Sequence, residues 1–234
     1  MLRVEGLVTG YDKDPVIREI SFEISDRQVL AVLGHNGAGK SSVVRTLVGL
    51  LPVWSGRILL GQSDVTHANS SQRVRAGIAV SFQDEPVFPT MTVEKNILMG
   101  GYSLGNNKRL VKEQTDKVVT LFPKLKERFR QLAYTLSGGE RRMLSISMAL
   151  MSDPRVLLLD EPSTGLSPGM TEHVMQTIAN IRDTLGKAVL LVEQNVQQAL
   201  SCSDQAIILK TGTIVFEGEP RALSDDSTKL IDMF

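Results

Sequence analysis

A glycine-rich segment near residue 40 carries the residue types that bind phosphate. The stretch VLAVLGHNGAGKSS is an apolar run followed by Gly34-x-x-x-x-Gly39-Lys40-Ser41 and then by a helical pattern. Glycines let successive backbone N–H groups face an anion, and the positive N-terminal end of the next helix adds to that field. The sequence therefore predicts a phosphate site made of Gly34, His35, Asn36, Gly37, Ala38, Gly39, Lys40, Ser41 and Ser42.

Four side chains of this segment and of a later strand suit phosphate hydrolysis. Lys40 supplies a cation for the β- and γ-phosphates, and the Ser41 hydroxyl is placed to ligate Mg²⁺. In RVLLLDEP an apolar strand ends at Asp160, whose carboxylate can hold Mg²⁺ through water. Glu161 is one residue further, points differently, and is free to take a proton from an attacking water. A plain acidic turn is the structural alternative for the acid pair.

A second glycine pair begins a helical pattern at LSGGE, residues 136–140. Ser137 as N-cap and Glu140 three residues later form a capping box, which is a sufficient structural explanation for these two residues. A capping box does not need Gly138 and Gly139, and each glycine costs about 1 kcal/mol where alanine would serve. We therefore interpret the pair as a place where another group approaches bare backbone.

Short apolar runs alternate with helical patterns along the chain. The runs 29–33, 79–82, 156–160, 188–192 and 206–209 are typical of buried strands, and helices are expected at 40–50, 169–185 and 196–200. This alternation predicts an α/β core with a mainly parallel sheet, in which the strand 188–192 lies beside the strand that ends at Asp160. Residues 2–8, 20–24 and 57–60 are expected to form a smaller antiparallel sheet, and KTGTIVFEGE indicates a hairpin.

The segment between these strands is different in character. After a loop at 84–90 with two prolines, Pro86 and Pro89, helical patterns follow at 93–100, 110–122 and 137–151 without a strand candidate. We expect one domain over 1–234, in which 1–83 and 152–234 form the nucleotide-binding core and 84–151 form a helical insert.

Composition excludes some classes of protein. The 234 residues are 42% hydrophobic and 22% charged, with 26 basic and 26 acidic side chains. A zero net charge gives no electrostatic signature of nucleic-acid binding. The apolar runs are much shorter than the roughly 20 residues of a membrane span, and the N-terminus lacks a signal-peptide pattern. The single cysteine, Cys202, is expected to be a core residue of a protein in a reducing, cytoplasmic compartment.

Taken in order, these motifs resemble those of the ATP-binding cassette (ABC) family over nearly the whole chain. The matching segments are GHNGAGKSS, Gln83 after IAVSF, LSGGE, VLLLDEP, STGLSP and the pair Glu193-Gln194. The resemblance implies a P-loop NTPase core, with ATP and Mg²⁺ bound and Gln83 among the metal and nucleotide contacts. It implies adenine stacking on Tyr11, for which simple packing is the alternative.

The same resemblance implies where the second glycine pair acts. In the family, two cassettes pair head to tail, and Ser137, Gly138 and Gly139 of one chain would close over the ATP held by the other. The implied partners are a second ATPase chain and transmembrane permease subunits, with indirect contact to a substrate-binding protein. The chain would then lie on the cytoplasmic face of the membrane.

Several segments are similar to the ATPase subunits of branched-chain amino acid importers and of their amide and urea relatives. These are VFPTMTVEKNILMGGY, LFPKLKERFRQLAYTLSGGE and LLVEQNVQQAL. Ser167 stands where most cassettes have aspartate, and Gln194 stands where most have a histidine. Arg141 and Arg142 replace commoner glutamines. Gln194 is expected to be a catalytic residue that orients groups at the γ-phosphate, and capping of the next helix is its structural alternative.

The leading hypothesis is an ATP-hydrolysing subunit that drives a membrane importer. The loop after Gln83, with apolar Val87, Phe88 and Met91, is expected to dock the membrane partner, although it could pack on its own domain. An exporter subunit, a soluble cassette acting in DNA repair or translation, and a nucleotide-binding assembly protein without turnover are the alternatives.

Overall fold

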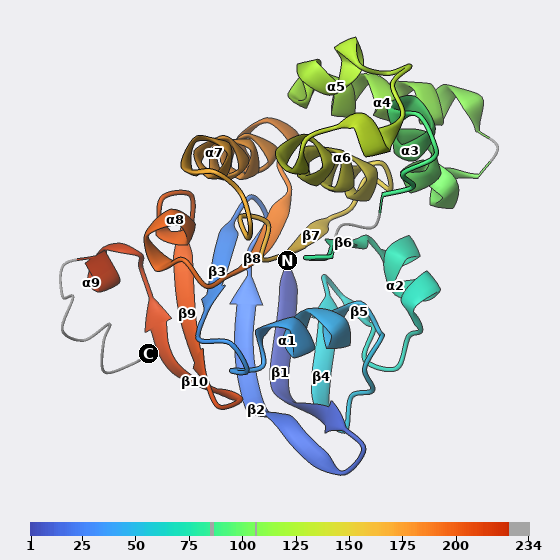
Figure 1. Ribbon diagram of the computed structural model, residues 1–234. Coiled ribbons are helices and arrows are strands. Elements are labelled where there is room, and N and C mark those ends of the chain that lie inside the picture. The colour runs from blue at the N-terminus through green and yellow to red at the C-terminus, as the bar shows by residue number, and fades with distance from the viewer. Residues whose placement is uncertain (85–86, 106, 225–234) are drawn as a thin grey trace.

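The structure is a computed structural model that describes residues 1–84, 87–105 and 107–224. Figure 1 shows two sheets in the lower part of the view, with a group of helices above them at one end. The arrangement confirms the predicted α/β class, an antiparallel N-terminal sheet and a mainly parallel sheet. Pro86, which belongs to the predicted docking loop, lies outside the described residues.

The N-terminal sheet has, within the described residues, the strand order β2-β1-β4-β5. Its strands are β1 (Leu2–Tyr11), β2 (Asp14–Ile24), β4 (Ser55–Leu60) and β5 (Ser63–Asp64). All the described pairings are antiparallel. β2 begins at Asp14, which pairs with Tyr11, and therefore starts earlier than predicted. The sequence did not indicate this first half because charged, exposed residues interrupt its apolar pattern.

The larger sheet has the order β10-β9-β3-β8-β7-β6 over the part of the chain that the structure describes. Its strands are β3 (Val29–Leu33), β6 (Ile78–Ser81), β7 (Val156–Asp160), β8 (Ala188–Glu193), β9 (Gln205–Lys210) and β10 (Thr213–Gly218). The pairs from β9 through β6 are parallel, whereas β9 and β10 form the predicted antiparallel hairpin. β7 and β8 are neighbours, as predicted.

Both faces of the central strands of the larger sheet are buried, which explains why β3 is apolar at every position. Leu30 and Val32 of β3 face a core shared with the N-terminal sheet and with helix α1 (Lys40–Leu47). Ala31 and Leu33 face the opposite core, which contains helices α6 (Gly138–Leu150), α7 (Pro168–Leu185) and α8 (Val196–Leu200). Successive residues of a strand point to opposite faces, so a strand covered on both sides must be apolar throughout.

Helix α1 is shorter than predicted, since it ends at Leu47 rather than residue 50. The buried guanidinium of Arg73 donates hydrogen bonds to the carbonyl oxygens of Thr46 and Leu47. It comes from helix α2 (Ser70–Ala76), an element that the sequence pattern did not predict. A cation at these last carbonyl groups stabilises the end of a helix.

The segment between β6 and β7 is helical in its described part. It contains α3 (Val93–Gly100), η1 (Gly101–Leu104), α4 (Lys108–Leu121), α5 (Pro123–Glu127), η2 (Ala133–Thr135) and α6. We call these elements the helical subdomain. Figure 1 shows them gathered at one end of the molecule, where α6 lies beside α7. A short helix, α9 (Arg221–Ser224), follows β10.

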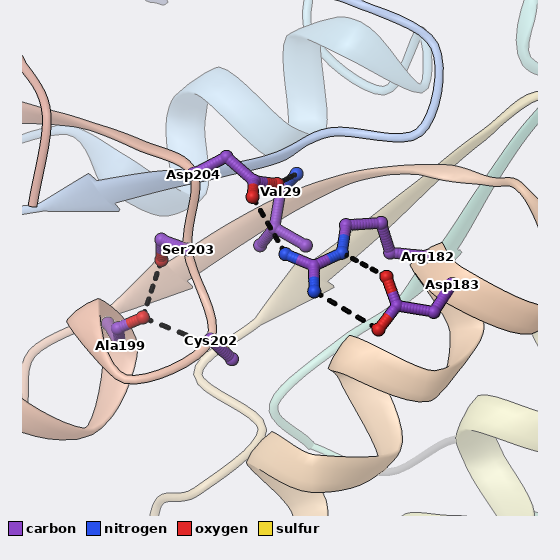
Figure 2. Close-up of polar contacts among 7 residues, drawn as sticks. All are labelled: Val29, Arg182, Asp183, Ala199, Cys202, Ser203 and Asp204. Carbon is purple, nitrogen blue, oxygen red and sulfur yellow. Dashed lines mark hydrogen bonds and ion pairs between the residues drawn. The ribbon is translucent and has the colours of Figure 1, made fainter.

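A polar network holds the start of β3, at the end of the strand opposite the phosphate-binding segment (Figure 2). One carboxylate oxygen of Asp204 accepts from the backbone N–H of Val29 at 2.8 Å, and the other accepts from Arg182 at 2.7 Å. Arg182 belongs to α7 and also pairs with Asp183 at 2.7 Å. Cys202 lies close by as a buried residue, as expected, and burial raises the pKa of its thiol to about 12. The network therefore joins α7 to the strand that carries the phosphate-binding segment.

None of the helices within the described ranges is long and apolar enough to span a membrane.

Candidate functional site

Most of the predicted site residues lie at the carboxyl ends of four parallel strands of the larger sheet. β3 leads into the glycine-rich segment, β6 into Gln83, β7 into Asp160 and Glu161, and β8 into Gln194. The carboxyl ends of neighbouring parallel strands meet at one edge of a sheet, which is where ligands bind in open α/β folds. The order β3-β8-β7-β6 therefore brings together residues that are far apart in the sequence.

The glycine-rich segment ends at Gly39, the N-cap of α1. Gly39 has a left-handed φ of 106°, and a Cβ at this position would lie 2.6 Å from Cδ1 of Ile17. The backbone conformation therefore favours glycine here, and a Cβ would also force the end of the Ile17 side chain to shift. No described side chain caps this helix, and its first turn has no acidic residue. Uncapped N–H groups at a helix N-terminus form a site for an anion.

Lys40 is buried at the base of this segment and faces inward. Its Nζ donates to the carbonyl oxygens of Gly34 at 2.8 Å and His35 at 3.1 Å. It also pairs with Oε1 of Glu161 at 3.3 Å. The cation is thus held directly between the glycine-rich segment and the end of β7.

Asp160 and Ser41 meet above the same strand ends. The Ser41 hydroxyl donates to Oδ1 of Asp160 at 3.1 Å. Asp160 is buried, and burial raises the pKa of its carboxyl, while the bond from Ser41 opposes this shift. A hydroxyl and a single carboxylate are hard oxygen ligands of the kind that hold Mg²⁺ together with water and substrate phosphates. These two residues therefore fit a magnesium ion.

Glu161 points away from Asp160 because the backbone turns sharply between them. Its φ is 47°, in the left-handed region that non-glycine residues seldom occupy, and its N–H donates to the carbonyl oxygen of Val192 at 2.9 Å. The neighbouring strand therefore holds the strained residue in place. Oε2 of Glu161 accepts from the hydroxyl of Thr164 at 3.2 Å, and Oε1 faces Lys40.

A cavity of about 480 Å³ opens beside Ser41 and Asp160. Tyr11 and Gln83 also line it, so the structure brings four predicted site residues to one cavity. Tyr11 is 43% exposed, and its hydroxyl accepts from Arg45 at 3.1 Å. An exposed aromatic ring that lines such a cavity is suited to stacking on a base.

Gln194 follows β8, the neighbour of β7, and lines a separate cavity of about 440 Å³ that Thr164 also lines. It is exposed, and Asn195 rather than Gln194 caps the helix that follows. The preceding Glu193 is buried, which raises the pKa of its carboxyl, and Oε1 accepts from the N–H of Ser163 at 2.9 Å. Glu193 thus ties β8 to the loop after Glu161. Because Asn195 caps the helix, capping does not explain Gln194.

The second glycine pair lies at the N-terminus of α6, away from the cavity that Tyr11 lines. Ser137 and Glu140 form the predicted capping box, and Ser137 is exposed. A Cβ at Gly139 would lie 2.3 Å from Cε of Met170, so this glycine gives space to α7 of its own chain. A Cβ at Gly138 would meet no described atom within 4 Å. Within one chain, close approach therefore explains Gly139 but leaves Gly138 without a contact.

Sequence reasoning missed two residues that support this site. Arg45 lines the main cavity, and Thr164 binds the Glu161 carboxylate. Arg45 stands one helical turn after Ser41, and this spacing places the two side chains on one face of α1, so the pattern offered a usable signal. Thr164 left no such signal because its contact depends on the turn after β7.

Comparison with known proteins identifies the family. A family model described as "ABC transporter" matches residues 17–164. The high-affinity branched-chain amino acid transport ATP-binding protein BraG of Pseudomonas aeruginosa is 41% identical over 223 residues, which cover 95% of this chain and 94% of the relative. The chain belongs to the ABC transporter family.

Two further relatives agree with this assignment. The probable branched-chain amino acid transport ATP-binding protein LivF of Archaeoglobus fulgidus is 38% identical over 95% of this chain and 94% of its own. The ADP conformation of MJ1267, an ATP-binding cassette of an ABC transporter, is similar in structure, with a TM-score of 0.88 and 25% identity over 100% of this chain and 97% of that chain. The chain is therefore an ABC-type ATPase with the cassette fold, and its nucleotide is ATP.

Proposed function

We propose that this ABC ATPase is the energy-coupling subunit of an importer for branched-chain amino acids or for related amides or urea. Its similarity to BraG and LivF carries the proposal, because it extends over about 95% of the chain rather than over the ATP-binding motifs alone. The substrate would not touch this chain. ATP binding and hydrolysis would instead drive movement of a membrane partner.

In the proposed hydrolysis, Lys40 binds the β- and γ-phosphates and the N-terminus of α1 adds its N–H groups. Glu161 takes a proton from the attacking water, whose oxygen forms a bond to the γ-phosphorus as the bond to ADP breaks. Ser41, Asp160 and Gln83 would hold Mg²⁺, which neutralises charge on the phosphate oxygens. The 3.3 Å contact between Lys40 and Glu161 supports this proposal, because it places the base next to the residue that binds the phosphates.

Two more residues complete the proposed site. Tyr11 stacks on adenine at the mouth of the 480 Å³ cavity, which its exposure supports. Gln194 orients the attacking water or a phosphate oxygen through its amide, since it follows β8 directly beside β7.

The active unit in this proposal is a head-to-tail pair of chains. Ser137, Gly138 and Gly139 of one chain close over the ATP that the other chain holds. The exposure of Ser137 supports this arrangement, as does the open space at Gly138 and the position of both outside the cavity that Ser41 lines. The partner chain is a second copy or a related cassette.

The permease would dock on the helical subdomain beside the end of β6, at the cytoplasmic face of the membrane. Phe88, Leu98 and Met99 are each about two-fifths exposed there, and Tyr102 is 87% exposed. A groove of about 420 Å³ runs between α2 and Tyr102. Val87 packs against the core of its own chain, which is the alternative that the sequence left open for this loop. Contact with a substrate-binding protein would be indirect, through the permease.

Uptake measurements test the proposed transport role. In cells whose uptake depends on this chain, at least one of radiolabelled leucine, valine and urea should accumulate with the parental protein and fail to accumulate with Glu161→Gln. Arg109→Met is a matched surface control, since Arg109 is 90% exposed on α4. Unchanged uptake of all three compounds with Glu161→Gln, together with altered efflux of another compound, would identify an exporter.

A further inference from the structure

Arg142 connects the helix that begins at the second glycine pair to the loop that carries Gln83. It lies on α6, and its side chain is 2% exposed. Nη1 donates to the carbonyl oxygen of Phe82 at 2.9 Å, and Nη2 donates to the carbonyl oxygen of Gln83 at 2.9 Å. One guanidinium therefore binds two successive carbonyl groups at the end of β6.

A second contact on the same face of α6 reinforces this connection. Ser145 stands three residues after Arg142, and its hydroxyl lies 2.8 Å from the hydroxyl of Ser81. Both serines are buried. Residues three apart share a helix face, so α6 holds three successive residues of the β6 end, Ser81, Phe82 and Gln83.

The far side of the same loop is also attached to the helical subdomain. The buried Asn96 of α3 accepts from the N–H of Phe88 at 2.6 Å. Its amide donates to the carbonyl oxygens of Phe88 and Thr92, both at 3.0 Å. α3 packs against α6, so residues on both sides of the loop take their positions from the helices.

The guanidinium is suited to fixing orientation as well as position. Its donors lie in one plane at fixed angles, so two bonds to successive carbonyl groups define the direction of the chain between them. The side chain of Gln83 leaves the backbone at this point and lines the cavity with Ser41 and Asp160. A shift or rotation of α6 would therefore move Gln83 relative to the proposed magnesium ligands.

We propose that Arg142 is a positioning residue for hydrolysis, which sets the place of Gln83 according to the position of α6. It acts through Gln83 and does not touch the nucleotide. The inference rests on the proposed role of Gln83 at the phosphates. It gives a physical reason for the second arginine of the pair Arg141-Arg142, one of the departures from the commoner family sequence.

Replacement by methionine tests the proposal, because Arg142→Met keeps an unbranched buried stem and loses the donors. We expect kcat for ATP hydrolysis by the purified chain to fall about tenfold, with KM for ATP changed by less than about twofold, since the loss lies in the arrangement of the reacting groups. Arg142→Gln keeps an N–H₂ group that can reach one carbonyl, so it should recover part of kcat. Arg109→Met should leave both constants unchanged.

A double-mutant cycle separates this proposal from the role of Gln83. Gln83→Ala should lower kcat. Adding Arg142→Met to it should cause no further loss, because Arg142 acts only by positioning the Gln83 side chain that is already absent. If Gln83→Ala leaves kcat unchanged, the proposed role of Gln83 is wrong. If Gln83→Ala lowers kcat but the effect of Arg142→Met is absent or multiplies in full, Arg142 does not act through Gln83.

Local hydrogen exchange provides a readout that does not depend on activity. In Arg142→Met, deuterium uptake should rise in the peptide that covers residues 79–84 while β3 and α7 stay protected. Should Arg142→Met fail to fold, Arg142→Gln takes its place in both the cycle and the exchange measurement. Unchanged uptake at 79–84 in a folded variant would overturn the proposal.

Discussion

At the scale of single residues, the feature that most directly determines chemistry is the change of direction between Asp160 and Glu161. Two adjacent carboxylates would repel each other if they pointed the same way. The left-handed backbone at Glu161 sends one towards Ser41 and the other towards Lys40. This separation supports the proposed roles, in which Asp160 binds a metal and Glu161 takes a proton.

Glu161→Gln should separate ATP binding from turnover. The amide keeps the shape and an acceptor for Thr164 but cannot take a proton, so we expect turnover to fall by about 10²-fold or more while ATP affinity stays within a few fold. Titration with a fluorescent ATP analogue and phosphate release measure the two quantities. Turnover at the parental rate would show that Glu161 is not the base.

Gln194 should matter through geometry rather than titration. Glutamine carries no charge near neutral pH, and its amide offers both a donor and an acceptor. We therefore expect Gln194→Ala to lower kcat by about 10²-fold, and Gln194→His to keep substantial activity. Gln197→Ala, on the helix that follows, is the matched control. Parental turnover in Gln194→Ala would remove Gln194 from the catalytic residues.

At the scale of elements, the strand that carries the phosphate-binding segment is fixed at its start by side chains from elsewhere. Asp204 accepts from the N–H of Val29 and binds Arg182 of α7 (Figure 2). The strand and the helix are thereby joined before the chain reaches the glycine-rich segment. The network therefore fixes the start of β3, the strand whose other end leads into the glycine-rich segment.

Asp204→Ala should destabilise this part of the fold. It leaves the Val29 N–H without its acceptor, which costs about 1–3 kcal/mol when the group is buried. Urea unfolding should show the loss, and hydrogen exchange should show faster exchange at β3. Asp183→Ala is the control, since Asp183 is 61% exposed and Arg182 keeps its bond to Asp204. Equal stability of the two variants would contradict this account.

The strands were predictable because burial on both faces leaves a continuous apolar run. VLAVL and VLLLD are strands at the predicted positions, and the residues that follow them lie together as expected. The end of α1 and the attachment of Gln83 were not predictable. Both depend on buried arginines, Arg73 and Arg142, that reach carbonyl groups 26 or more residues away, and such contacts have no periodic pattern in the sequence.

Some features of the candidate site were predictable from the sequence and others were not. Ser41, Asp160 and Gln83 share one cavity because they follow or end strands whose carboxyl ends lie at one edge of the larger sheet. The glycine at 139 had a second explanation that only the structure reveals, since Met170 of α7 occupies the space beside it. The sequence indicates which residues can bind phosphate. It does not show which neighbouring side chain occupies the space beside a glycine.

At the scale of the whole molecule, the residues of the proposed site lie in two separate places on one chain. Ser41 and Asp160 line one cavity, and Ser137 lines a different cavity of about 150 Å³ with Met170. A second chain in the opposite orientation would bring Ser137 and Gly138 to the nucleotide. We therefore propose that each ATP site is built by two chains.

Mixing two inactive variants tests this claim most directly. Lys40→Ala removes the phosphate cation, and Ser137→Arg places a bulky side chain at the second glycine pair, so each variant alone should lack ATPase activity. In a mixed pair, the intact Lys40 of one chain faces the intact Ser137 of the other, and one working site should return. We predict that phosphate release reappears on mixing, at a level that follows the fraction of mixed pairs measured with two differently tagged chains. A mixture that forms such pairs and yet stays as inactive as either parent would contradict the claim.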